Sequence, residues 1–221
     1  MAGAARAAGH AGWFCQLSAR VWSDSRGAMI TAAAPGPDGL LRCPWALSAP
    51  EYLAYHDDEW GKPVGSVQGL YERMTLEAFQ SGLSWITILR KRENFRRAFA
   101  GFQPELVAAF GDDDLVRLLN DPGIVRNRSK ITAAIDNARL VVDLGPRYAD
   151  LILGYRVIGR PRPGAGEWRA TSPESVALAK ELKAVGFRFF GPTTAYAMMQ
   201  AVGLIDDHVA GCFAPPPAWP D

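Results

Sequence analysis

Cysteine and histidine are scarce in this sequence. Its 221 residues include three of each: Cys15, Cys43 and Cys212, and His10, His56 and His208. So few cysteines in a chain of this length do not form the disulfide framework that small secreted domains use. We therefore expect a cytoplasmic protein.

Long hydrophobic runs and an excess of one charge are also missing. No run approaches the ~20 uninterrupted apolar residues of a membrane-spanning helix, so we expect no membrane partner. The formal net charge is +1, so a nucleic-acid partner would have to meet a local basic patch. Hydrophobic residues make up 48% and charged residues 21% of the chain, as in ordinary soluble globular proteins. This length predicts one domain, although two small ones are also compatible with it.

The two ends of the chain differ from the rest. Residues 1–40 are rich in alanine and glycine without a sustained period, and they lack the compact apolar region and cleavage site of a signal peptide. We expect a disordered extension there, or an upstream start with Met29 as the natural first residue. Residues 41–214 form the expected folded domain, and residues 215–221 are a proline-rich tail.

Helical signals dominate from Pro50 on. Apolar residues recur at helical spacing, and serine, proline and glycine stand where caps belong. The pattern predicts helices at about 50–60, 67–81, 85–99, 104–110, 112–120, 148–156, 173–185 and 193–202, and a longer one after the Pro122-Gly123 break that carries Ile131, Ala134, Ile135, Ala138 and Val142. No segment of period two stands out, so we expect an all-α fold.

Cysteines and histidines from both ends of this domain could hold a metal. His208 and Cys212 are four residues apart, so one turn of helix would place them on one side. Cys43 and His56 lie near the start of the domain. Two thiolates and two imidazoles are a donor set that zinc prefers, and four protein ligands would close the site to catalysis. Spacing alone favours the alternative, in which the cysteines are core residues and the histidines form local hydrogen bonds, because about 150 residues separate the two pairs.

Glu77 lies on the edge of the apolar stripe of its expected helix. A half-buried carboxylate needs a partner. One interpretation is a salt bridge to a nearby arginine or a cap on the helix that follows Ser84. The other is a pocket acid that accepts hydrogen bonds from a ligand. Four aromatic residues flank this helix in the sequence: Trp45, Tyr55, Trp60 and Trp85. Aromatic walls and a carboxylate suit a flat cationic ligand, although core packing explains most such residues.

Two basic stretches follow. "RKRENFRR" spans residues 90–97, and Arg126, Arg128 and Lys130 come after the Pro122-Gly123 break. Charge runs are usually solvated faces. A short turn at Gly123 between two helices, with basic residues just after it, is also a way to bind a phosphate. The helix-hairpin-helix signal is degenerate here, because Gly123-Ile124 replaces a fuller Gly-x-Gly turn.

Together these stretches closely resemble the DNA-3-methyladenine glycosylase I family of the helix-hairpin-helix superfamily. The matching segments are "RCPWA" (42–46), "YLAYHDDEWGKP" (52–63), "LEAFQSGLSWITILRKRENFRRAF" (76–99), "GIVRNRSKI" (123–131) and "LKAVGFRFFGPTTAYAMMQAVGLIDDHVAGC" (182–212). They cover nearly all of residues 42–213. The resemblance implies an all-α helix-hairpin-helix glycosylase fold. It also implies one structural zinc ion joining the N- and C-terminal segments through Cys43, His56, His208 and Cys212.

The resemblance further implies a base pocket of Glu77, Tyr55, Trp45 and Trp85. A monomeric enzyme would flip N3-methyladenine out of alkylated double-stranded DNA and hydrolyse its glycosidic bond, leaving an abasic site. The lesion is cationic and leaves readily, so no strong acid or paired carboxylates are needed. No lysine stands out as a Schiff-base nucleophile, so we expect no lyase activity. Acceptance of N3-methylguanine and the group that activates water stay open.

DNA contacts are expected around the two turns of the domain. Leu83, in the turn of "SGLSW", would fill the gap left by the flipped base, or else is a buried turn residue. Gly123, Arg126, Arg128 and Lys130 would hold phosphates. Asp136 and Asp143 receive no role. Two rival hypotheses are a zinc-stapled module that binds DNA without chemistry and a small-molecule enzyme with the same aromatic pocket.

Overall fold

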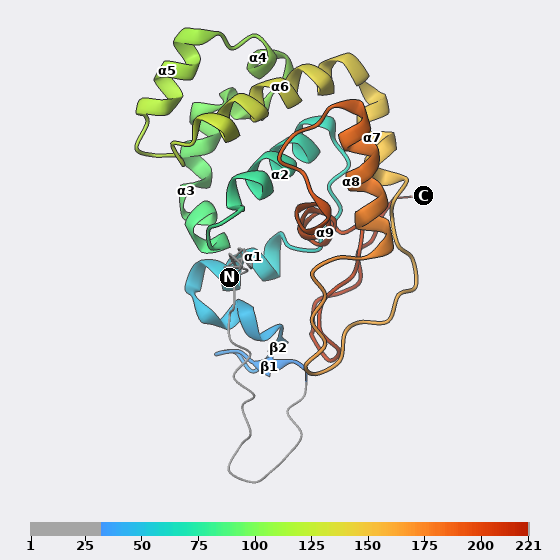
Figure 1. Ribbon diagram of the computed structural model, residues 1–221. Helices are drawn as coiled ribbons and strands as arrows, with labels where there is room; N and C mark the ends of the chain where they lie inside the picture. Colours follow the sequence, from blue (N-terminus) through green and yellow to red (C-terminus); the bar gives the residue numbers. More distant parts are fainter. Residues whose placement is uncertain (1–31, 221) are drawn as a thin grey trace, which may run out of the picture.

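The computed structural model describes residues 32–220, and helices account for most of them (Figure 1). The expectations for residues 1–31, including Met29 as the start, lie outside the described residues. The helices are α1 (Pro50–Asp58), α2 (Val67–Gln80), α3 (Trp85–Ala98), α4 (Pro104–Ala108), α5 (Asp112–Asn120), α6 (Arg128–Leu144), α7 (Pro146–Leu153), α8 (Pro173–Val185) and α9 (Pro192–Ala201), with short 3-10 helices η1 (Pro44–Ser48) and η2 (Ala100–Phe102). The mainly helical prediction is confirmed.

Local caps explain several helix ends. The Ser66 hydroxyl accepts a hydrogen bond from the Gly69 N–H at 3.1 Å and starts α2. Ser172 and Ser175 bond reciprocally at the start of α8, and Gly186 ends that helix with a φ of +116°. Ser84 precedes α3 as expected, but its hydroxyl lies 2.8 Å from the Thr87 hydroxyl and does not cap a backbone N–H.

A small hairpin departs from the all-α expectation. Strands β1 (Ala34–Pro35) and β2 (Leu41–Arg42) pair antiparallel, with Ala34 opposite Arg42. Strands of two residues have no measurable period, so the sequence pattern could not indicate them. Because β1 precedes residue 41, the folded part includes residues that the sequence analysis assigned to the extension.

Helix α2 lies at the centre of the helical part and contacts α3, α6, α7 and α9 (Figure 1). From Leu70 to Phe79 all residues of α2 except Glu72 are buried. Tyr71, fully buried, donates a hydrogen bond to the Ala134 carbonyl of α6 at 2.9 Å. Because neighbouring helices cover most of this stretch of α2, the side chain of Glu77 lies inside the protein.

The segment after α9 returns to the start of the folded part. The Phe213 N–H donates to the Leu41 carbonyl at 2.7 Å, and Arg162 donates to the carbonyls of Cys212 and Ala214. The Trp219 indole N–H donates to the Gly203 carbonyl at 2.8 Å, which holds the proline-rich tail against the domain. In Figure 1 the hairpin and this C-terminal segment lie at the same end of the molecule.

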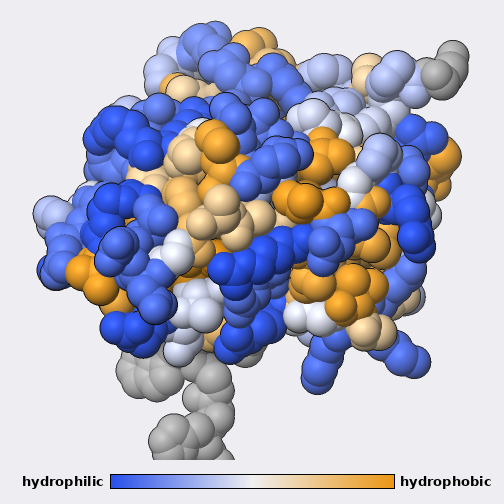
Figure 2. All heavy atoms as spheres, turned by 90° about the horizontal axis from the view of Figure 1, so that it is seen from above, coloured by the Kyte–Doolittle hydropathy of each residue, from blue (hydrophilic) through white to orange (hydrophobic). Residues whose placement is uncertain are grey.

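The surface of the described part is mixed. The end of the molecule formed by α4, α5 and α6 shows separate apolar areas between hydrophilic side chains (Figure 2). Leu106, Val116 and Val142 are exposed residues of these three helices. Within residues 32–220, none of the helices combines the length and the apolar character that spanning a membrane requires.

Candidate functional site

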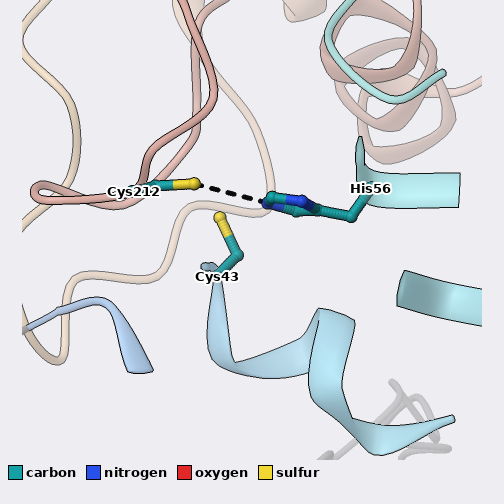
Figure 3. Close-up of side chains that lie close together, drawn as sticks. All are labelled: Cys43, His56 and Cys212. Atoms are coloured by element: carbon teal, nitrogen blue, oxygen red, sulfur yellow. Dashed lines mark hydrogen bonds between the residues drawn. The ribbon is translucent and has the colours of Figure 1, made fainter. Parts of the chain in front are cut away.

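Three of the four predicted metal ligands meet in the structure. The donor atoms of Cys43, His56 and Cys212 all lie within 4.8 Å of one another, and all three residues are buried. Figure 3 shows their side chains pointing toward a common point, with the Cys212 Sγ 3.4 Å from the His56 Nε2. Cys43 directly precedes η1, His56 belongs to α1, and Cys212 belongs to the C-terminal segment. The cluster therefore joins both ends of the domain.

His208 lies beside this cluster. Its ring centroid is 5.2 Å from that of His56, and its Nε2 atom is buried without a hydrogen-bond partner among the described residues. The helical turn expected between His208 and Cys212 is wrong. Gly211 adopts a φ of +87°, and the Ala210 N–H donates to the Pro163 carbonyl, so this stretch is a turn that a distant loop holds in place.

Each histidine is oriented by an aspartate, and each aspartate by an arginine. The His56 Nδ1 lies 2.8 Å from Asp57, and the Arg42 Nε lies 2.9 Å from the same carboxylate. At the other end of the domain, the His208 Nδ1 lies 3.0 Å from Asp206, which the Arg162 Nε meets at 2.9 Å. An Nδ1 atom that donates to a carboxylate leaves Nε2 as the free ligand atom, and metal-binding histidines are commonly held in this way.

The aspartates were not among the predicted site residues. Asp57 follows His56 directly, and Asp206 stands two residues before His208. A carboxylate this close in sequence to each candidate ligand was the available signal.

The two thiols influence each other's ionisation. Their hydrogen bond is the main cause that raises the pKa of Cys43 and lowers the pKa of Cys212. Two adjacent sulfur donors and two oriented imidazoles form a donor set suited to zinc.

Glu77 is 5% exposed, and its carboxylate has no hydrogen bond or ion pair with any described residue. Burial raises the pKa of Glu77 from its ordinary 4.5 to about 8, and the charge of Arg73 offsets part of this rise. Arg73 itself pairs with Glu59 at 3.0 Å. The structure therefore shows neither the salt bridge nor the helix cap that would have given Glu77 a purely structural role.

Tyr55 links the two tryptophans that the sequence predicted for the pocket. Tyr55 lies 5.5 Å from Trp85 and 6.3 Å from Trp45, measured between ring centroids. Burial, and then the charge of Glu77, raise the pKa of Tyr55. The structure thus brings together Trp45 of η1, Tyr55 of α1 and Trp85 at the start of α3, and Glu77 lies buried on α2.

Several polar groups of this region lack partners. The Trp85 Nε1 and the Arg73 Nη1 atoms are buried without a hydrogen bond in the described part of the chain. Buried polar atoms are nearly always paired, so an unpaired set that includes Glu77 indicates a place where a ligand supplies the missing bonds. Arg73 was missed at the sequence level, although it stands four residues before Glu77 on the same helix.

The basic residues divide into two groups. On α3, Arg90 pairs with Glu51, Arg92 with Glu59, and Arg96 with Glu72 and Glu93. These arginines mainly join helices. Arg126 and Arg128, before and at the start of α6, are exposed.

Lys130 does not fit the phosphate contact expected of it. It is 8% exposed, and its Nζ donates to the carbonyls of Phe79 at 2.9 Å and Ser81 at 2.6 Å. Lys130 therefore caps the end of α2, because these carbonyls have no partner in the helix itself.

The two predicted DNA-facing turns are present. Gly82, with a φ of +82°, follows α2, and Leu83 after it is 39% exposed. Gly123 lies in the turn between α5 and α6, where a Cβ would come within 2.8 Å of the Asp121 carboxylate. The Gly123 N–H donates to that same carboxylate at 2.7 Å, so in this structure it is not available to donate to a phosphate.

Comparison with known proteins decides the family. Residues 45–215 match the family model of methyladenine glycosylase. This chain belongs to the methyladenine glycosylase family. It is 43% identical to DNA-3-methyladenine glycosylase 1 of Escherichia coli K12 over 180 residues, which cover 78% of this chain and 96% of that protein. The DNA-3-methyladenine glycosylase of Haemophilus influenzae is 40% identical over 177 residues, or 77% of this chain and 96% of its own.

Solved structures of this family share the fold. A crystal structure of 3-methyladenine DNA glycosylase I superposes with a TM-score of 0.74 at 43% identity, covering 79% of this chain and all of that one. A variant of such an enzyme in complex with 3-methyladenine reaches a TM-score of 0.72 at 33% identity, covering 78% of this chain and 96% of its own. The helical architecture and the family expected from the sequence are confirmed.

Proposed function

We propose that this methyladenine glycosylase flips N3-methyladenine out of alkylated double-stranded DNA and hydrolyses its N-glycosidic bond, leaving an abasic site. The observation that carries the proposal is the carboxylate of Glu77, which is buried and has no hydrogen bond or ion pair with any described residue. A related glycosylase structure contains 3-methyladenine. The protein would act as a monomer in the cytoplasm.

The proposed pocket suits the chemistry of this lesion. N3-methyladenine in DNA carries a positive charge, so its glycosidic bond is weak and its base leaves readily. Trp45 and Trp85 would pack against the flat base, and Tyr55 would line the site. Glu77 would accept hydrogen bonds from the adenine edge. Unmethylated adenine lacks the charge and leaves poorly, so selectivity comes partly from the substrate itself.

Water would complete the cleavage without a covalent enzyme intermediate. Lys130 is the lysine tied to the end of α2, and its amine already donates to two carbonyls. An amine held in this way is a poor nucleophile for a Schiff base. We therefore propose a monofunctional glycosylase without lyase activity.

The proposed DNA contacts lie at the two exposed turns. Arg126 and Arg128 would bind phosphate at the start of α6. The first backbone N–H groups of a helix have no acceptor within the helix, so they favour an anion there. The helix–turn–helix of α5 and α6, with Gly123 in the turn, would serve as the helix-hairpin-helix. Leu83 would fill the space that the flipped base leaves. Lys130 is removed from this set because of its bonds to α2.

We also propose one structural zinc ion bound by Cys43, His56, His208 and Cys212. The donor set fits the metal, and the buried Nε2 of His208 lacks a partner among residues 32–220. With four protein ligands, zinc would supply no catalytic chemistry and would only tie the chain ends together. Glu77 and the aromatic rings would carry the reaction.

Chromatography of bases released from methylated DNA tests the proposal. The wild-type protein should release N3-methyladenine, and Glu77→Gln should release it far more slowly while remaining folded. A wild-type protein that binds duplex DNA but frees no base would instead support the DNA-binding module. Binding of a small cationic ligand without any dependence on DNA or salt would support the small-molecule enzyme.

A further inference from the structure

Phe189 is exposed in a backbone conformation that side chains avoid. It lies in the loop between α8 and α9 and has a φ of +56°. The flanking Phe187 and Phe190 are buried, whereas Phe189 is 40% exposed. The left-handed region suits glycine or asparagine, and a large aromatic residue there is uncommon. Both the exposure of an apolar ring and the left-handed backbone conformation are unfavourable, yet the fold keeps Phe189 in this position.

A buried asparagine holds this conformation in place. Asn137 of α6 is 3% exposed. Its side-chain amide donates to the Arg188 carbonyl at 3.1 Å, and its side-chain oxygen accepts from the Arg188 N–H at 2.9 Å. Both backbone groups of the residue before Phe189 are therefore fixed. Strained residues that their surroundings hold so firmly are typically found where function requires the geometry.

The loop lies against the helix that carries Glu77. Phe189 and Arg188 line a small crevice with Ala78 and Phe79 of α2 and with Lys130 of α6. Lys130 bonds to the carbonyls of Phe79 and Ser81, directly before the turn that presents Leu83. In Figure 1 the loop between α8 and α9 passes in front of α2. Phe189 is therefore exposed near the same end of α2 as Leu83.

The surroundings of Phe189 carry an excess of positive charge. Arg188 and Arg139 both pair with Asp136, at 3.1 Å and 3.0 Å. Two guanidinium groups share one carboxylate, and the Arg188 side chain is 51% exposed. The apolar ring of Phe189 could contact DNA bases, and the positive charge of the neighbouring Arg188 could contact a phosphate.

We propose that Phe189 is a second apolar side chain that enters the duplex beside the flipped base. This proposal rests on the proposed function, because a wedge requires the protein to bind and bend lesion-containing DNA. Apolar wedges of this kind partly unstack a base step and hold the duplex in a kinked form. Phe189 would act as a positioning residue, since it lies apart from the reacting bond.

The test measures DNA binding and stability on the same variants of the full chain. The probe is a duplex with an abasic-site analogue and a neighbouring 2-aminopurine, whose fluorescence rises when it unstacks. Phe189→Ala and Phe189→Gly should weaken binding about tenfold and reduce the fluorescence rise, by analogy with other aromatic contacts to bases. Phe189→Leu should retain most of both effects. Trp168→Ala, which removes an aromatic side chain that is 80% exposed, is the matched control and should bind as the wild type does.

Thermal unfolding separates this role from a structural one. Phe189→Gly relieves the backbone conformation, so its Tm should equal or exceed that of the wild type while binding weakens. Unchanged duplex binding, or a loss of binding that follows a lowered Tm, would overturn the proposal. If the wild-type protein releases N3-methyladenine and the Phe189 variants release it equally fast, only this inference fails. If the wild type releases no base, the proposed function itself fails.

Discussion

Glu77 shows how one residue can oppose folding and serve function. An acid whose pKa is raised in the folded state, here from 4.5 to about 8, binds its proton more tightly there than in the unfolded chain. Stability therefore falls as the pH rises from about 4.5 to about 8, where the folded protein must ionise a buried group. The positive charge of Arg73, on the same helix, favours the ionised carboxylate and offsets part of this rise in the pKa of Glu77.

The first prediction follows from the loss of stability that ionisation of Glu77 causes as the pH rises. Glu77→Gln should increase the free energy of unfolding at pH 8.5 by about 1–3 kcal/mol, because it removes a charge that burial disfavours. Below about pH 4.5 the gain should vanish, since the glutamate is then neutral in both states. Urea denaturation at the two pH values measures both. A variant less stable than the wild type at pH 8.5 would mean that the carboxylate has a partner in the folded protein.

The second prediction concerns the rate of base excision. If the carboxylate form of Glu77 accepts hydrogen bonds from the lesion, kcat/KM should rise with pH until about pH 8 and then level off, because kcat/KM reports the pKa of the free enzyme. In Glu77→Gln the residual activity should lose this rise. The initial rate of base release at duplex concentrations well below KM, measured across pH 6–9, gives kcat/KM and hence the profile. A rate that falls through the same range would instead require the protonated acid.

At the scale of elements, local chemistry predicted the helices better than the connections. α5 was expected at 112–120 and lies there, and α8 begins after Ser172 as predicted, because caps act within a few residues. The hairpin of β1 and β2 was missed, since strands of two residues carry no period. The turn at 208–212 was mistaken for helix because a hydrogen bond to Pro163, far away in sequence, decides its shape.

In the candidate site, too, local features could be predicted from the sequence, whereas contacts between distant segments could not. A carboxylate in an apolar stripe is visible in the sequence, but that pattern left a salt bridge, a helix cap and a ligand pocket open for Glu77. Only the family resemblance implied a pocket with Tyr55, Trp45 and Trp85. Lys130 was misassigned, since its basic side chain gave no sign that α2 would end beside it. Only the packing of α6 against α2 decides whether that amine reaches solvent or a carbonyl.

The third prediction separates Lys130 from its basic neighbours. Lys130→Met leaves two carbonyls at the end of α2 without their donor, so unfolding should become easier by about 1–3 kcal/mol. Arg128→Ala removes an exposed side chain and should leave stability within about 0.5 kcal/mol. Thermal and urea unfolding measure the difference.

Salt dependence completes the comparison. The slope of log affinity for duplex DNA against log salt should become shallower by about 1 in Arg128→Ala and stay unchanged in Lys130→Met. The opposite result, a shallower slope in Lys130→Met alone, would return Lys130 to the DNA surface.

At the scale of the whole molecule, the two chain ends are joined by a network that the metal would complete. Arg42 and Asp57 orient His56 from one end, and Arg162 and Asp206 orient His208 from the other. Arg42, Asp57 and His56 lie close together in the sequence, whereas Arg162 and Asp206 are 44 residues apart. Only the fold brings the two groups to the same place. If the proposed zinc ion is bound, its removal with a chelator should lower the Tm of the full chain, since metal binding and folding are coupled.

The fourth prediction uses two adjacent aspartates of the C-terminal segment. Asp206 accepts from His208, whereas Asp207 accepts from Tyr196 at 2.8 Å and Gln200 at 2.6 Å. Asp206→Asn should weaken zinc affinity about 10–100-fold, because the His208 ring loses the carboxylate that fixes its Nε2 as the ligand atom. Asp207→Asn disturbs the same segment without touching a histidine, so its zinc affinity should stay close to wild type. Competition with a chromophoric chelator measures both, and equal losses in the two variants would show that the segment's general stability, and not the orientation of His208, controls the metal.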